Sequence, residues 1–263
     1  MKSYEIGIIS DLHLGSFVAL RREPQNPVQE QLLVRWLEVV PWLHGCDLLV
    51  VNGDCNDGLD PKGRNLQVDN VPWQIEEAEA LILMLEPKRI RMTYGSSYHV
   101  GDTVLYERFL AGYLERRGID CKIAAYQDIA VGWWKGMFRH ATGRSVIPHG
   151  RFTAGARSRM WGVQKAARVS KETGKPAVLR DLYCYSHVHY YAESGDSTGR
   201  VLVTPGWKAA GVSDNFGAKS FDDMVDIGAS KAVVHDPEDA AAGYSIEVKK
   251  WPAEVTDESE RLV

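Results

Sequence analysis

The chain has 263 residues, of which 44% are hydrophobic and 25% charged, which is the composition of a globular protein with a sizeable core. No apolar stretch approaches the roughly 18 residues of a membrane span. The start, Met-Lys-Ser-Tyr-Glu, runs into a strand pattern without a signal-peptide core, and the four cysteines form no Cys-x-x-Cys pair. We therefore expect a soluble cytoplasmic protein without membrane contact, with one domain over 1–263 and a loose acidic tail at 250–263.

The net charge of −4 is spread unevenly along the chain. Residues 133–176 contain ten basic residues and a single acid, whereas residues 214–263 are strongly acidic. A basic segment in an acidic chain suggests a local anionic target. For residues 165–175 we prefer the alternative of a solvated helix face. Four tryptophans are expected to pack in or beside the core and not to stack on bases: Trp133, Trp134, Trp161 and Trp207.

The first half of the chain alternates strands and helices. Residues 4–10 read as a buried strand, and residues 27–43 place apolar side chains at helical spacing. The run CDLLVV at 46–51 fits a strand that is covered on both faces. The alternation continues with a helix at 75–85, a strand at 89–94 and a helix at 102–117. This order predicts a parallel or mostly parallel sheet.

The second half is dominated by short strands joined by turns. A long helix at 153–173 interrupts them, and Gly174-Lys175-Pro176 ends it. The expected strands are 121–125, 129–134, 144–147, 178–185, 201–204, 224–227 and 244–248. This mixture suggests a second sheet with antiparallel members, so we expect an α/β fold without internal repeats.

Polar clusters follow five of the predicted strands where each strand ends. In chain order they are Asp11-Leu12-His13, Gly53-Asp54-Cys55-Asn56-Asp57-Gly58, Gly95-Ser96-Ser97-Tyr98-His99, His149-Gly150 and Ser186-His187-Val188-His189. Ligands of open α/β sheets bind beyond the carboxyl ends of the strands, so these clusters can converge on one crevice. Residues i and i+2 point the same way in extended backbone, so each Asp-x-His or His-x-His pair can offer two ligands to one side.

The residue types in these clusters are those of a metal centre. Mixed imidazole and carboxylate ligation suits Mn, Fe, Zn or Ni better than Ca or Mg. Asp54 follows a buried strand, where an uncompensated carboxylate would be costly, and its two oxygens can bridge two cations about 3.5–4 Å apart. These ligand types leave Mn, Fe, Zn and Ni open. We expect two divalent transition metal ions, with Mn as the first candidate and Fe, Zn or Ni as alternatives.

As an ordered set, these motifs resemble those of the calcineurin-like metallophosphoesterases, over the stretch from Asp11 to His189. The resemblance implies a four-layer αββα sandwich of two mixed sheets flanked by helices. It also implies the roles of the site residues: Asp11, His13 and His189 hold the first metal, His149 and His187 hold the second, Asp54 bridges both, and Asp57 supports the ligands from behind.

The third motif departs from the family's usual G-N-H-[D/E]. It reads Gly95-Ser96-Ser97-Tyr98-His99, so the asparagine that normally reaches the second metal is missing. Ser96 or a water can stand in for it, and His99 is a candidate general acid because imidazole titrates near neutral pH. The G-[ST]-x-x-H pattern and the later Pro205-Gly206-Trp207 are similar to phage-encoded members. The last motif begins with Ser186 in place of the usual glycine.

Two histidines compete for the fourth motif. His149 follows an apolar strand and precedes a glycine, whereas His140 lies in a stretch that reads as a hairpin turn. We therefore prefer His149 as the ligand, with His140 as the alternative.

The resemblance implies hydrolysis of a phosphoester by a hydroxide that bridges the two metals, with Asp54 and His99 as catalytic residues. The local positive charge favours a phosphodiester, nucleotide or nucleic acid as the phosphorylated substrate. Arg151, Arg157 and Arg159 would bind its further phosphates, because arginine suits bidentate phosphate contacts.

Two other functions are compatible with the sequence. The altered third motif fits a catalytically weak protein of the same fold that acts as a nucleic-acid-binding or scaffold module, since a fold does not guarantee an activity. The same ligands could also serve a metal-dependent hydrolase that cleaves another bond, such as an amide.

Overall fold

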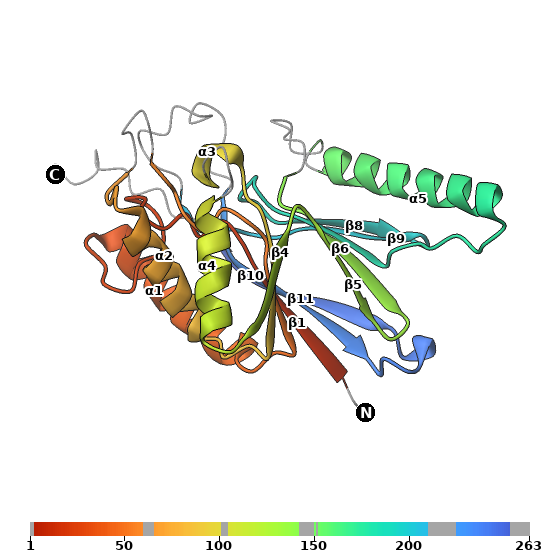
Figure 1. The fold of residues 1–263 in the computed structure, drawn as a ribbon, viewed down its shortest axis with the longest axis horizontal. Helices are drawn as coiled ribbons and strands as arrows, with labels where there is room; N and C mark the ends of the chain where they lie inside the picture. Colours follow the sequence, from red (N-terminus) through yellow and green to blue (C-terminus); the bar gives the residue numbers. More distant parts are fainter. Residues whose placement is uncertain are drawn as a thin grey trace.

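The protein folds into four layers, in which two β-sheets pack face to face and helices cover both outer faces (Figure 1). The structure is a computed structural model that describes residues 3–59, 66–100, 105–141, 150, 152–209 and 225–252. The predicted α/β sandwich of two mixed sheets is therefore confirmed.

The first sheet has six strands in the order β11-β10-β1-β2-β3-β4. Neighbours from β1 to β4 run parallel, as the alternation of strands and helices predicts, and β10 and β11 are antiparallel to their neighbours. Its strands are β1 (Ser3–Ile9), β2 (Leu48–Val51), β3 (Arg89–Thr93), β4 (Asp120–Ala124), β10 (Asp226–His235) and β11 (Tyr244–Pro252).

Helices α1 (Pro27–Leu43), α2 (Val71–Leu83) and α4 (Leu105–Arg116) cover the outer face of this sheet, and the short α3 (Ser97–Val100) precedes α4. The bounds of α1 are those predicted from the sequence. Its first turn is fixed by a proline and by the Asn26 side chain, which accepts a hydrogen bond from the backbone N–H of residue 29.

The second sheet has five strands in the order β5-β6-β7-β9-β8, with α5 (Thr153–Thr173) on its outer face. Its strands are β5 (Gln127–Val131), β6 (Trp134–Phe138), β7 (Leu182–Tyr185), β8 (Ala192–Asp196) and β9 (Gly199–Val203). The predicted strand at 129–134 is wrong, because Gly132, at φ 56°, turns the chain between β5 and β6. β8 was not predicted.

Three apolar layers hold the sandwich together. The largest lies between the first sheet and its helices, and a second lies between the two sheets, where Ile6 and Ile8 of β1 share a cluster with Trp134 and Phe138 of β6. The third lies on the α5 side of the second sheet. Successive side chains of a strand point to opposite faces, so β1 supplies Ile9 to the helix side and Ile6 and Ile8 to the sheet side.

The C-terminal boundary differs from the prediction of a loose tail from residue 250. Residues 250–252 belong to β11, which pairs with β10 and follows the short 3-10 helix η2 (Ala240–Ala242). The remaining tail, 253–263, and the predicted strand 144–147 lie outside the described residues. None of the described helices combines the length and the apolar character needed to cross a membrane.

Candidate metal centre

Four of the five predicted clusters, together with His140, meet at one edge of the sandwich, beyond the carboxyl ends of β1, β2, β3, β6 and β7. Asn52, directly after β2, connects three of these ends. Its Nδ2 donates to Oγ of Ser186 at 3.0 Å, and its Oδ1 accepts from Oγ1 of Thr93 at 2.9 Å. The two sheets are therefore tied together where the site residues emerge.

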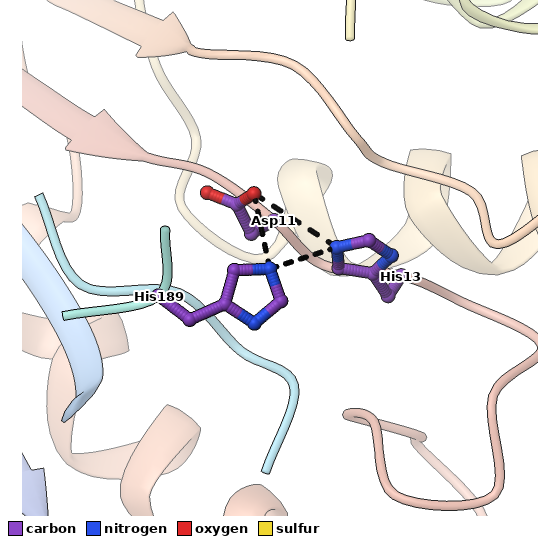
Figure 2. A group of neighbouring side chains, drawn as sticks. All are labelled: Asp11, His13 and His189. Carbon is purple, nitrogen blue, oxygen red and sulfur yellow. Dashed lines mark hydrogen bonds and ion pairs between the residues drawn. The ribbon is translucent and has the colours of Figure 1, made fainter. Parts of the chain in front are cut away.

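The first cluster consists of Asp11, His13 and His189, which converge in Figure 2. Nε2 of His13 lies 3.1 Å from Nε2 of His189, and Oδ1 of Asp11 lies 3.8 Å and 3.4 Å from these two nitrogens. Oδ1 of Asp11 is buried and has no hydrogen-bond partner among the described residues. Three potential ligand atoms thus surround one point.

His13 is held so that its Nε2 faces the cluster. Its Nδ1 lies 3.0 Å from Oδ1 of Asp57, and because a carboxylate only accepts, Nδ1 carries the hydrogen and Nε2 presents its lone pair. Burial lowers the pKa of His13 to about 3, so the ring is neutral. Oδ1 of Asp57 is also 3.1 Å from Nζ of the buried Lys208 and 3.2 Å from Nδ1 of His99.

The second cluster consists of Asp54, His140 and His187. Nε2 of His140 lies 2.9 Å from Oδ2 of Asp54, and Nδ1 of His187 lies 3.7 Å from the same oxygen. Burial alone would lower the pKa of His140, but the charge of Asp54 and their hydrogen bond raise it to about 10. His187 is the most accessible of the three, with 40% of its side chain exposed.

Asp54 lies between the two clusters. Its Oδ2 is 4.0 Å from Nε2 of His13 in the first cluster and 2.9 Å from Nε2 of His140 in the second. Ser96 supports the other oxygen, because its backbone N–H donates to Oδ1 at 2.7 Å, and its hydroxyl donates to the same carboxylate. Although burial opposes ionisation, the neighbouring histidines hold the pKa of Asp54 well below its ordinary value.

The backbone of the site is strained. Seven described residues other than glycine have a positive φ, and five of them belong to the clusters: Asp11 at 52°, His13 at 47°, Asp54 at 51°, His187 at 76° and His189 at 53°. Such conformations are unfavourable for residues with a Cβ, and they persist where the surrounding structure imposes them. Their concentration here marks this edge of the sandwich as a candidate functional site.

Two glycines make room for the second cluster. A Cβ on Gly95 would lie 2.1 Å from Oδ1 of Asp54, and a Cβ on Gly53 would lie 2.6 Å from the ring of His140. The glycines of the second and third motifs are therefore required by close packing around the carboxylate and the imidazole.

Of the two histidines considered for the fourth motif, His140 is the one that lies among the described residues. His149 lies outside the described residues, whereas His140, which was interpreted as part of a turn, is buried at the centre of the second cluster. The reason is tertiary: its Nδ1 donates to the carbonyl oxygen of Asn52 at 2.7 Å, on the opposite sheet.

His99 and the expected phosphate-binding arginines have different surroundings. His99 packs edge-on against His13, with ring centroids 4.4 Å apart. Arg159 is buried in α5 and forms a bidentate pair with Asp196 at 2.5 and 2.6 Å. Its guanidinium therefore anchors the helix, and this contact takes the place of the phosphate contact that we expected for it. Arg157 is exposed on the same helix, and Arg151 lies outside the described residues.

Glu107 is a residue of the site that was not predicted. It is fully buried in α4, where its carboxylate accepts from the backbone N–H of Gly95 at 2.7 Å and of Cys55 at 3.3 Å. Burial and the charge of Asp54 raise the pKa of Glu107 to about 7. The sequence contained a signal, because Glu107 stands on the same helix face as the buried Leu110 and Leu114.

The segment Pro205-Gly206-Trp207 closes the crevice beside the first cluster. The backbone N–H of Trp207 donates to the carbonyl oxygen of Asp11 at 2.9 Å, and a Cβ on Gly206 would lie 2.9 Å from Cβ of Asp11. The Trp207 ring is buried against Trp36 of α1. This segment therefore fixes the backbone of Asp11 from the core side.

The residues present fit divalent transition metal ions. Imidazole nitrogens and carboxylate oxygens are the donors that such ions prefer, and Asp11 offers a buried oxygen that accepts no hydrogen bond from the described residues. His13 is oriented by a carboxylate behind it, as metal-binding histidines usually are.

No family model and no curated protein matches this chain. Among solved structures, the chain is similar to an uncharacterised protein of Streptococcus pneumoniae described as a predicted phosphoesterase, with 11% identity, TM-score 0.40, and coverage of 96% of this chain and 99% of that one. It is also similar to a novel archaeal phosphodiesterase, with 13% identity, TM-score 0.42, and coverage of 93% of this chain and 99% of that one. A third similar structure is Vps29 of Entamoeba histolytica complexed with Zn²⁺, with 12% identity, TM-score 0.42, and coverage of 95% of this chain and 99% of that one. Similarities this low do not transfer an activity, so function has to be inferred from the crevice itself.

Proposed function

We propose that this protein is a phosphodiesterase that uses two divalent cations. The observation that carries the proposal is the position of Asp54 Oδ2, which is 2.9 Å from Nε2 of His140 and 4.0 Å from Nε2 of His13. A carboxylate within reach of two imidazole clusters can bridge two cations. The first cluster would hold one ion, the second cluster would hold the other, and Asp54 would contact both.

When bound, two such ions supply positive charge that polarises a phosphoryl oxygen and lowers the pKa of water. The chain contributes orientation. Asp57 fixes the ring of His13, and Asn52 fixes the ring of His140 through its carbonyl oxygen. Ser96 holds the carboxylate of Asp54 from the third motif, so a serine performs a supporting role there.

His99 would hold the proton for the leaving oxygen. Its Nδ1 lies 3.1 Å from the carbonyl oxygen of Asp57 and 3.2 Å from its Oδ1, so Nδ1 donates and Nε2 carries the transferable proton when the ring is charged. Burial opposes that charge, but the hydrogen bond to Asp57 and the nearby carboxylates raise the pKa of His99. A general acid that is protonated near neutral pH suits this role.

The alternative of a scaffold without catalysis has less support. A scaffold needs no strained ligands, whereas five of the seven described non-glycine residues with positive φ are His or Asp residues of this crevice.

The test is hydrolysis of bis-p-nitrophenyl phosphate by the Mn²⁺-loaded protein, with wild type beside Asp54→Asn. We expect the variant to lose on the order of a thousandfold in kcat/KM, because several kcal/mol of charge stabilisation depend on both ions. The matched control is Asp128→Asn, an exposed acid of β5 paired with Arg180, which should retain activity. EDTA should abolish turnover, and equal background from wild type and Asp54→Asn would favour the scaffold. Parallel assays with p-nitrophenyl phosphate test the preference for a diester.

A further inference from the structure

One face of α5 is exposed along the whole helix. We call it the outer face; it consists of Arg157, Trp161, Gln164, Arg168 and Lys171. These positions recur at intervals of three or four residues, so they form a single stripe. The buried residues of the helix, Gly155 and Arg159, lie on the opposite side.

The helix packs on the second sheet over its first half, where a Cβ on Gly162 would lie 2.7 Å from the Tyr183 hydroxyl, and it is mostly exposed beyond that. A Cβ on Gly155 would lie 2.5 Å from Val201 of β9, and Arg159 forms its bidentate pair with Asp196 of β8. No residue after Arg159 in the helix is buried. Figure 1 shows α5 extending along the outside of β8 and β9.

The start of α5 lies beside the metal centre. A Cβ on Gly155 would lie 3.7 Å from the ring of Tyr185, and the Tyr185 hydroxyl donates to Oγ of Ser158 at 2.6 Å. Tyr185 is the last residue of β7 and directly precedes the loop that carries His187 and His189. The outer face therefore begins near the clusters and leads away from them for about 21 Å, at 1.5 Å per residue.

The charge of this region is opposite to that of the chain. Residues 153–175 contain six basic residues and one acid, in a protein of net charge −4. Arg168 pairs with Glu172 at 3.1 Å, but both are exposed, so the pair is weak. Arg157, Lys165 and Lys171 form no ion pair with any residue that the structure describes.

An aromatic ring stands within this basic stripe. Trp161 is 66% exposed, whereas Trp134 and Trp207 are fully buried. The expectation that Trp161 packs in or beside the core is therefore wrong. Cationic side chains that follow a phosphate backbone, interleaved with an exposed aromatic ring on which a base can stack, are typical of single-stranded nucleic-acid binding. An acidic peptide would use the cations but would leave the ring without a partner.

We propose that the outer face of α5 binds a single-stranded segment of nucleic acid and leads its backbone to the metal centre. The assignment of this strand as the substrate rests on the proposed phosphodiesterase function. The binding itself does not, because the outer face contains none of the cluster residues.

The test is fluorescence anisotropy of a 5′-fluorescein-labelled dT15 oligonucleotide with the full chain in EDTA, over a series of salt concentrations. The triple variant Arg157→Gln, Arg168→Gln, Lys171→Gln should bind at least tenfold more weakly and reduce the salt slope by about two, since each phosphate contact in a single strand contributes about 0.7. Trp161→Ala should weaken binding about tenfold through lost stacking.

Matched controls lie on the opposite side of the sandwich. The triple variant Arg89→Gln, Arg116→Gln, Lys122→Gln removes the same number of exposed charges around β3, α4 and β4, and Phe109→Ala removes an exposed ring of α4. Both should bind dT15 as wild type does. Circular dichroism of each variant verifies that it is folded.

Equal weakening by the two triple variants, or unchanged binding by Trp161→Ala, would overturn the proposal; the second result would point to an acidic partner. Since binding is measured without divalent cations, it is independent of catalysis. Failure of wild type to hydrolyse bis-p-nitrophenyl phosphate would refute the proposed function while the anisotropy result for α5 still stands.

Discussion

The two clusters of the metal centre are supported by different buried acids. Behind the first cluster, Asp57 accepts from His13 and from the ammonium of Lys208, and these contacts hold the pKa of Asp57 below its ordinary value although burial opposes ionisation. Behind the second cluster, the hydrogen bonds that Glu107 accepts from the described residues come from backbone N–H groups, and burial together with the charge of Asp54 raises the pKa of Glu107 to about 7. Asp57 is therefore charged and paired, whereas Glu107 has a pKa of about 7 and is partly protonated near neutral pH.

The ligands differ in the same way. His13 is neutral, since burial lowers its pKa to about 3, whereas the pKa of His140 is raised to about 10 against its burial by Asp54. The first cluster is therefore oriented for a cation in advance. In the second cluster, His140 must lose a proton before its nitrogen can bind a cation. A second difference is access at the most exposed histidine of each cluster, because the side chain of His187 is 40% exposed and that of His189 is 20% exposed.

The largest expected difference is in activity. His13→Gln should reduce kcat/KM for bis-p-nitrophenyl phosphate on the order of a thousandfold, because the position of the His13 ring is 2% exposed and water does not replace it there. His187→Gln should reduce it only about thirtyfold, or about 2 kcal/mol, because water can reach its position. Equal losses in Mn²⁺-saturated assays would remove the distinction between the clusters.

Glu107→Gln should change the pH dependence of stability in the metal-free protein. The pKa of Glu107 is about 7 in the fold and 4.5 ordinarily, so the folded state keeps a proton that the unfolded state has released between these pH values. Raising the pH from 4.5 to 7 should therefore lower the free energy of unfolding of wild type, relative to the variant, on the order of 3 kcal/mol. Urea titrations at several pH values measure it, and parallel pH profiles would contradict the assignment.

Asp57→Asn should weaken the first cluster selectively. An amide cannot match the carboxylate as an acceptor for Nδ1 of His13, so the tighter site should lose about 10- to 100-fold in Mn²⁺ affinity. Calorimetric titration of wild type and variant gives both affinities. The comparison would fail if the weaker site lost as much as the tighter one.

The smallest expected difference between the clusters is the number of protons that each releases when it binds a cation. At pH 8, loading the second cluster should release about one more proton than loading the first, because His140 is protonated before the ion arrives. Calorimetry in buffers of different ionisation enthalpy counts these protons. The same release for both ions would show that His140 is neutral beforehand.

The convergence of the candidate ligands at one edge of the sheet could be predicted because they follow apolar strands. Asp11 and Asp54 come directly after buried β1 and β2, and parallel neighbours end at the same edge of a sheet. The bounds of α1 and α5 could also be predicted, since a proline starts the first and Gly174, at φ 69°, ends the second. Such features can be predicted because the residues that cause them lie within a few positions of one another in the sequence.

The remaining features depend on contacts between distant segments. His140 was interpreted as part of a turn because its neighbours are turn-like, and its place is set by the carbonyl of Asn52, which lies 88 residues away in sequence. β8 has one buried residue, Ala192, so no alternating pattern marks it. Glu107 resembles a solvated helix residue until the loops of the second and third motifs pack over it.

The positive φ angles of five cluster residues lower the stability of the fold, whereas their side chains are the candidate metal ligands. A left-handed backbone conformation disfavours a residue with a Cβ on the order of 1 kcal/mol, and glycine would relieve most of it. An engineer who selected this chain for heat resistance alone would therefore be drawn to replace these ligands. Thermostabilised variants of this protein should therefore be tested for Mn²⁺ binding before they are used in further work.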